Sequence, residues 1–199
     1  MDSGILSGPE IVKQIEAGRI TIDPFDPKKV NPASVDLTLG EHIGIYQGTY
    51  QMNAESDDGR WAMGIRPSIW DSKKSRDMDH HIMDAEQGWV LQPGIGYLLH
   101  TKERVTTNHY VPVLDGKSSI GRAFILVHFT AGYGDPGFDG QYTLEVTSLF
   151  PVRIYPGMRF CQMRFHTMVG EPLLYKEKGH YQGEAAQGAV ASQIHRQFD

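Results

Sequence analysis

One carboxylate inside an apolar strand is the side chain best suited to acid–base chemistry. Glu145 lies between Leu144 and Val146. Neighbours along a strand point to opposite faces, so Glu145 shares a face with Thr143, and the apolar face also takes Tyr142. A solvated strand face is one interpretation, because most acidic residues are exposed. The other is a general base in a pocket, whose apolar walls raise the pKa of the carboxyl toward working pH.

A second group of polar residues precedes this strand. Ser118 and Ser119 follow the turn signal Asp115-Gly116, and Arg122 lies one helical turn later. An ordinary polar turn would have this composition. Two hydroxyls, a guanidinium and free backbone N–H groups would also bind phosphate oxygens. The glycine-dense turn at 132–137 allows the backbone to approach a ligand closely.

Composition narrows the class of protein. The 199 residues suffice for one domain with a sizeable core, and the 22 glycines and 11 prolines favour a β-rich fold with many turns. A net charge of −5 argues against a general nucleic-acid binder. We expect no membrane partner, because no apolar run approaches the roughly 20 residues of a membrane helix and the N-terminus lacks a signal-peptide pattern.

The single cysteine, Cys161, limits two further possibilities. It cannot form an intramolecular disulfide, which suits a reducing cytosol. It also excludes the His/Cys/Cys zinc site of the usual nucleobase deaminases. We therefore expect no zinc, and a cytoplasmic location (the host cytoplasm if the protein is viral).

Periodicity predicts the elements that position these residues. Ser7 is a candidate N-cap for a short amphipathic helix that ends near Gly18. Apolar and polar residues alternate over 35–39, which predicts a half-buried strand, and two strands are expected around the Pro-Gly turn within 88–100. In the alternating segment 159–168, we place Phe160, Gln162, Arg164 and His166 on one face and Cys161, Met163, Phe165 and Thr167 on the other, which we expect to be core.

Residues 41–83 are the least informative part of the sequence. We expect strands interrupted by long surface loops. The pair His80-His81 invites a metal-site interpretation, but adjacent strand residues point to opposite faces and no further ligand stands at a helpful spacing. A solvated loop is the preferred interpretation.

Several motifs together resemble the dCTP deaminase family, which shares its fold with trimeric dUTPases. They are NPASVDLTLG at 31–40, GKSSIGR at 116–122, HFTAGYGDPGF at 128–138, GQYTLEV at 140–146 and YQGEAAQGAVASQI at 181–194. The resemblance implies a mainly β fold, a dUTPase-like distorted β-barrel or jelly-roll, with a short N-terminal helix in 1–20 and a C-terminal lid arm in 176–199. It implies one domain over 1–199. Asp36, in the first motif, would belong to the structural frame.

The resemblance implies zinc-independent hydrolysis of the 4-amino group of dCTP, giving dUTP and ammonia. Glu145 matches the family's catalytic acid. Ser118 and the backbone carbonyl of Ala131 match the groups that hold the attacking water. Arg122 would keep the carboxylate ionised and stabilise charge.

The same resemblance implies a nucleotide site built from residues across the chain. Ser119 would contact phosphate, Asp135 the sugar 3′-hydroxyl, Phe138 the deoxyribose and Gln141 the base edge, with candidate lid contacts in the tail. The full candidate set is Lys117, Ser118, Ser119, Arg122, Asp135, Phe138, Gln141, Tyr175, Tyr181 and Gln187. Mg²⁺ would be held by the triphosphate. The resemblance also implies a homotrimer with sites between subunits, and dTTP is a candidate inhibitor.

Departures from the family pattern leave alternatives open. Lys117 stands where many members have Arg, and Glu184 stands where a phosphate-binding Gln is common. Thr130-Ala-Gly-Tyr133 and Gly140-Gln141 look closer to bifunctional members and dUTPases. Deamination to dUTP is the first expectation. The alternatives are a bifunctional deaminase and dUTP diphosphatase that forms dUMP, a dUTPase only, and a nucleotide-binding regulator without turnover.

Overall fold

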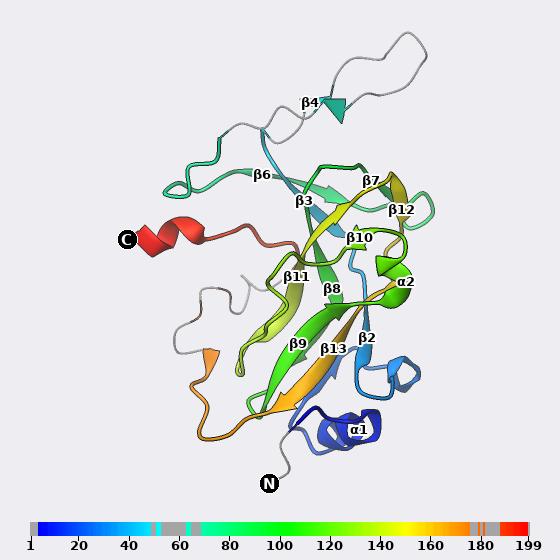
Figure 1. Cartoon of the computed structure of the whole chain (residues 1–199), viewed down its shortest axis with the longest axis vertical. Coiled ribbons are helices and arrows are strands. Elements are labelled where there is room, and N and C mark those ends of the chain that lie inside the picture. Colours follow the sequence, from blue (N-terminus) through cyan, green and yellow to red (C-terminus); the bar gives the residue numbers. More distant parts are fainter. Residues whose placement is uncertain are drawn as a thin grey trace.

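Two β-sheets contain most of the strands and share the apolar core. The computed structural model describes residues 4–48, 51–52, 63–64, 69–175, 179, 181 and 188–198. The larger sheet has the strand order β10-β11-β8-β3-β6, with β1 paired to β8, and the smaller sheet has the order β2-β13-β9 (Figure 1). Two short pairs, β7 with β12 and β4 with β5, complete the pairing of named strands.

The elements are short and follow the predicted order. The strands are β1 (Thr21–Asp23), β2 (Val35–Thr38), β3 (His42–Tyr46), β4 (Gln51–Met52), β5 (Met63–Gly64), β6 (Met78–Ile82), β7 (Trp89–Leu91), β8 (Tyr97–Thr106), β9 (Tyr110–Gly116), β10 (Ile125–Leu126), β11 (Asp139–Ser148), β12 (Val152–Ile154) and β13 (Arg159–Thr167). The helices are α1 (Gly8–Glu16) and α2 (Ser118–Gly121), with 3-10 turns η1 (Pro27–Lys29) and η4 (Ile194–Phe198). The mainly β prediction is confirmed. Across the described residues, none of the helices has the length and apolar character needed to cross a bilayer.

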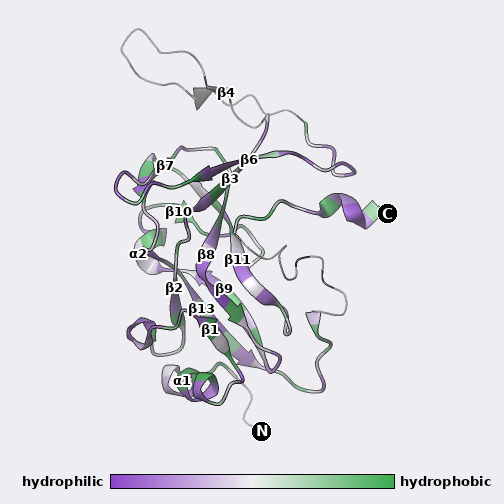
Figure 2. Ribbon diagram, turned by 180° about the vertical axis from the view of Figure 1, so that it is seen from behind, coloured by the Kyte–Doolittle hydropathy of each residue, from purple (hydrophilic) through white to green (hydrophobic). Residues whose placement is uncertain are grey.

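The N-terminal helix forms as its sequence predicts. Ser7 caps α1 by accepting a hydrogen bond from the Glu10 N–H at 3.4 Å, and a proline occupies its first turn. Ile11 is completely buried, while the opposite side of the helix is polar, so hydrophilic and hydrophobic residues alternate along its ribbon (Figure 2). The helix thereby covers one end of the smaller sheet, where the Leu6 N–H bonds to the Phe165 carbonyl at 2.9 Å.

Strand β2 corrects the prediction of a half-buried strand, because all four of its residues are buried. Its polar side chains have partners inside the protein. The Asp36 carboxylate lies 2.5 Å from the Lys117 ammonium, and the Thr38 hydroxyl donates to Glu103 at 2.7 Å. Buried polar groups with such partners avoid the desolvation penalty that makes polar residues favour the surface. A single-strand pattern contains no information about these distant partners.

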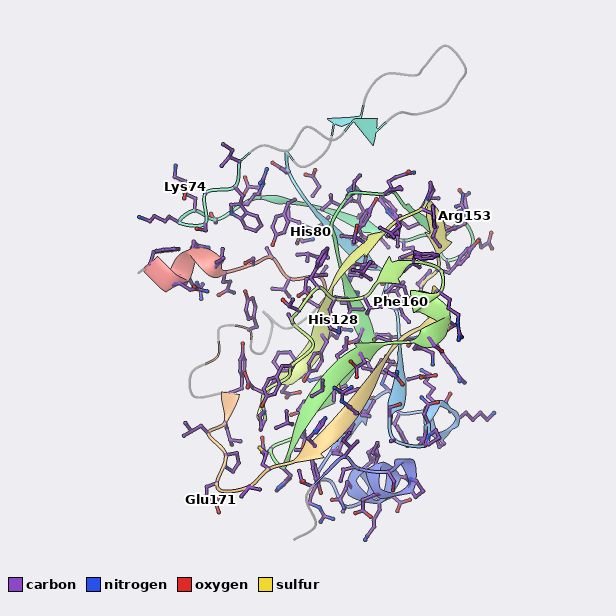
Figure 3. The ribbon with its side chains drawn as sticks, viewed as in Figure 1. Lys74, His80, His128, Arg153, Phe160 and Glu171 are labelled. Atoms are coloured by element: carbon purple, nitrogen blue, oxygen red, sulfur yellow. The ribbon has the colours of Figure 1, made fainter. Side chains whose placement is uncertain are left out.

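The prediction of a solvated loop at His80-His81 is wrong. Both residues lie on β6, which pairs antiparallel with β3 at the end of the larger sheet. His80 is exposed there (Figure 3). A strand at a sheet edge has one solvated side and needs little apolar alternation, so the residues MDHHI gave a weak signal.

The face assignment in β13 is partly wrong. Cys161, Met163 and Phe165 are completely buried as expected, but Phe160 is completely buried too (Figure 3). The register against β2 shifts between Arg159 and Cys161. Such an irregularity turns two consecutive side chains inward, which strict alternation does not foresee.

Candidate functional site

Strand β11 positions Glu145 at the edge of a large cavity. Glu145 is the register partner of Leu98 on β8, and its neighbours Leu144 and Val146 are completely buried on the opposite face. The register shifts between Gln141 and Thr143. Tyr142, which we expected on the apolar face, lies at this irregularity and also lines the cavity.

The cavity has a volume of about 700 Å³. Glu145 is half-buried in its wall, so the pocket interpretation describes this residue better than a solvated strand face. Burial raises the pKa of the Glu145 carboxyl, while a backbone N–H and His128 partly counteract this effect. Its Oε2 atom is buried and has no hydrogen-bond partner among the described residues.

His128 is a neighbour of Glu145 to which the sequence analysis gave no role. It lies beside β11 (Figure 3), and its Nδ1 atom is also buried without a hydrogen-bond partner among the described residues. Its ring packs so closely on Gly132 that a Cβ there would come within 2.9 Å of Cε1 and Nε2. The available signal was one polar residue inside the apolar run 123–129.

The structure brings many of the candidate residues to the same cavity as Glu145. They are Ala131, Asp135, Phe138, Gln141, Tyr175 and Tyr181. Phe138 packs edge-to-face on Tyr142 and Tyr175, with ring centroids 4.8 Å and 5.7 Å apart. This aromatic group presents a flat apolar wall, suited to a sugar or a base. The individual roles assigned to these residues stay predictions.

The serine group does not line the cavity of Glu145 in a single chain. Lys117 and Ser118 instead line a second cavity of about 430 Å³, together with Asp115, Gln162 and Arg164. Ser119 and Arg122 lie on or next to α2, and both are exposed. The Lys117 side chain is directed at Asp36. Gln187 and Glu184 lie outside the described residues.

A family model described as dCTP deaminase-like matches residues 5–168. The chain belongs to the dCTP deaminase-like family. It is 37% identical over 195 residues to a protein of Clostridium beijerinckii named "dCTP deaminase, dUMP-forming", covering 98% of this chain and 99% of that protein. A protein of the same name from Leptospira biflexa is also 37% identical, with 98% of both chains covered.

A solved structure supports the family fold. It is the 2′-deoxycytidine 5′-triphosphate deaminase of Agrobacterium tumefaciens, with a TM-score of 0.58 and 22% sequence identity. The match covers 84% of this chain and 49% of that one, so this chain spans about half of the solved chain. At this identity the likeness concerns the fold alone, and it agrees with the expected dUTPase-like architecture.

Part of the cavity wall comes from outside the residues that the deaminase-like model matches. The C-terminal segment 188–198 crosses the cavity, and Val190, Ser192 and Ile194 line it. Tyr46 and Trp70, whose rings pack 4.6 Å apart, close another side. Sequence reasoning missed Tyr46 and Trp70 because residues 41–83 carry no recognisable motif.

Proposed function

We propose that this chain deaminates dCTP and then hydrolyses the product to dUMP and pyrophosphate. The observation that carries the proposal is the half-buried Glu145 carboxylate with its unpartnered Oε2, in a cavity that an aromatic wall also lines. The curated relatives over nearly the whole chain have names that state dUMP formation, which favours the bifunctional alternative over a deaminase that stops at dUTP.

The chemistry assigns Glu145 the role of general base. It would take a proton from water as the water oxygen attacks C4 of cytosine, and pass a proton to N3. The adduct then collapses, the C4–N4 bond breaks and ammonia leaves. The raised pKa of Glu145 supports this role, because a carboxylate whose pKa approaches working pH is a stronger base than an exposed one.

We propose that a complete site needs two subunits of a homotrimer. In one chain Ser118 opens on a different cavity from Glu145, while Ser119 and Arg122 are exposed. A neighbouring copy would supply these three residues to water and phosphate. Exposed apolar side chains between and beyond the two groups suit a subunit contact: Phe124, Phe129, Tyr133, Leu149 and Phe150.

Mg²⁺ and the cellular setting complete the proposal. Among the described parts of the chain, no three His, Cys, Asp or Glu side chains gather in a group that could hold a metal ion. Mg²⁺ would be carried by phosphate oxygens, as is common for triphosphates, and would neutralise their charge. We expect the enzyme to act in the cytoplasm, with dTTP tested as an inhibitor.

Ammonia, pyrophosphate and nucleotide products should be measured separately after incubating the purified chain with dCTP and Mg²⁺. Equal amounts of ammonia and pyrophosphate, with dUMP as the nucleotide product, are expected. Accumulation of dUTP would support a deaminase only, and pyrophosphate from dUTP without ammonia from dCTP would support a dUTPase. Tight dCTP binding with neither product would indicate a regulator. Glu145→Gln should bind dCTP yet release no ammonia, and undiminished turnover would remove Glu145 from the mechanism.

A further inference from the structure

Side-chain oxygens hold the C-terminal segment 188–193 over the cavity by accepting hydrogen bonds from its backbone. The four bonds run from Gly188 N to Gln141 Oε1 (2.7 Å), Val190 N to Thr143 Oγ1 (3.3 Å), Ser192 N to Tyr46 OH (2.6 Å) and Gln193 N to Tyr181 OH (2.8 Å). We call the four accepting residues the latch. Because N–H groups of alternate residues in an extended chain point the same way, the first three bonds fit an extended segment.

Both ends of the Gln141 amide are engaged in this arrangement. Oε1 accepts the Gly188 N–H, and Nε2 donates to the Lys102 carbonyl at 3.0 Å. Reading a base edge, the role that the family resemblance implies, would require at least one of these ends. In this conformation Gln141 therefore serves the arm.

The arm enters the latch at a glycine. Gly188 has a φ of +70°, and a Cβ there would come within 3.2 Å of His42 Nδ1. A larger residue would be strained and would crowd the imidazole, which stacks on the buried His100 ring. The close approach brings the Gly188 N–H within reach of Gln141.

The docked arm forms a wall of the cavity that contains Glu145. Val190, Ser192 and Ile194 line it, and Tyr46, which accepts the Ser192 N–H, interacts electrostatically with Glu145. A wall that keeps water from the carboxylate favours its uncharged form. Arm position and the basicity of Glu145 are thereby linked.

We propose that Gln141, Thr143, Tyr46 and Tyr181 are positioning residues that hold the C-terminal arm as a wall of the reaction cavity before a nucleotide binds. The arm geometry stands on the hydrogen bonds alone. Its consequence for catalysis rests on the proposed function. Two measurements, one without nucleotide and one with it, separate these parts.

Hydrogen exchange in the nucleotide-free protein tests the latch itself. Tyr46→Phe removes one accepting oxygen and keeps the ring beside Trp70, and Gln141→Ala removes another. Amides in 188–193 should exchange about threefold to tenfold faster in each variant, since one hydrogen bond is lost. Gln87→Ala, an exposed glutamine in the turn before β7, is the matched control and should exchange like the wild type. Unchanged exchange in both latch variants would overturn the proposal.

The pH profile of kcat/KM for dCTP tests the catalytic consequence. The titratable groups that line the cavity or act on Glu145 are Tyr46, Tyr133, Asp135, Tyr142, Tyr175, Tyr181 and His128. Because water would reach Glu145 more freely, the acid limb should move to lower pH in Gln141→Ala and Tyr46→Phe, toward that of an ordinary glutamate. A merely structural defect would lower activity without moving this limb.

The outcomes distinguish the two proposals. If the wild type releases no ammonia, the proposed function fails, and exchange at 188–193 still decides the latch. If Gln141→Ala changes the preference between dCTP and dUTP while arm exchange stays as in the wild type, Gln141 is a base reader and its latch assignment is wrong. An acid limb that stays in place despite faster exchange overturns the link between the arm and Glu145.

Discussion

The ammonium of Lys117 lies 2.5 Å from the carboxylate of Asp36, whose side chain is only 2% exposed. Asn31 donates to the same carboxylate at 2.7 Å, and Arg159 lies 3.5 Å from it. The ion pair ties the residue that precedes α2 to strand β2. Lys117 therefore orients the start of the serine segment from below, whatever it contributes to phosphate binding.

Replacing Lys117 by Met should destabilise the protein by up to about 3 kcal/mol, because Asp36 would keep its charge in a buried place with one partner fewer. The effect should appear in urea unfolding of the nucleotide-free chain. Lys74→Met is the matched control: its ion pair with Asp71 spans 3.7 Å, and the lysine is 78% exposed. The control should change stability by less than about 1 kcal/mol. Equal effects of the two variants would contradict the structural role of Lys117.

Two inactive variants should restore activity when their subunits mix. Ser118→Ala keeps Glu145, and Glu145→Gln keeps Ser118, so a site between unlike subunits can hold both intact residues. If subunits exchange at random in equal amounts, about a quarter of the sites would be intact in a ring with sites between neighbours. Ammonia release after joint unfolding and refolding measures this fraction. No recovery in a mixture that does form mixed oligomers would place the whole site within one chain.

Glu145→Gln should stabilise the protein more at neutral than at acidic pH. Burial raises the pKa of Glu145 in the folded state above its unfolded value of about 4.3. Between these two values the unfolded chain binds fewer protons, so the stability that this residue contributes falls as pH rises. Glutamine removes the dependence. The melting temperature of the variant minus that of the wild type should grow from about pH 4 to about pH 7. A constant difference would mean that the carboxyl is not effectively desolvated.

Local patterns predicted the parts of the site that depend on neighbours in sequence. The alternation around Glu145 placed it opposite Leu144 and Val146, and the glycine-dense turn placed Ala131 and Asp135 on the cavity wall. The register irregularity at Tyr142 was not predictable, because it depends on the pairing of β11 with β8.

Other features depend on contacts between distant segments. The burial of Asp36 depends on Lys117, 81 residues later, and the latch joins Tyr46 to Ser192, 146 residues apart. Neither partner shows a pattern that indicates the other. The family resemblance supplied the idea of a lid, but only the fold shows which side chains hold its backbone.

His100 should make the protein sensitive to mild acid. Its ring is buried, Nδ1 donates to the Thr101 carbonyl at 2.9 Å, and Nε2 accepts the His42 N–H at 3.2 Å. Burial lowers the pKa of His100; His42 lowers it further, while the Thr101 carbonyl, Glu41 and Gln141 act in the opposite direction. A proton on Nε2 would face the His42 N–H and break that hydrogen bond.

The sign of the pH dependence follows from this lowered pKa. Below the unfolded value of about 6.5 the unfolded chain takes up a proton that the folded chain resists, so stability present above that pH is lost as pH falls. His100→Gln should flatten the decline in unfolding free energy between about pH 7 and pH 5, even if it lowers stability overall. His80→Gln, on the exposed side of β6, should follow the wild type. If the His100 variant and the wild type decline in parallel, another group sets the acid sensitivity.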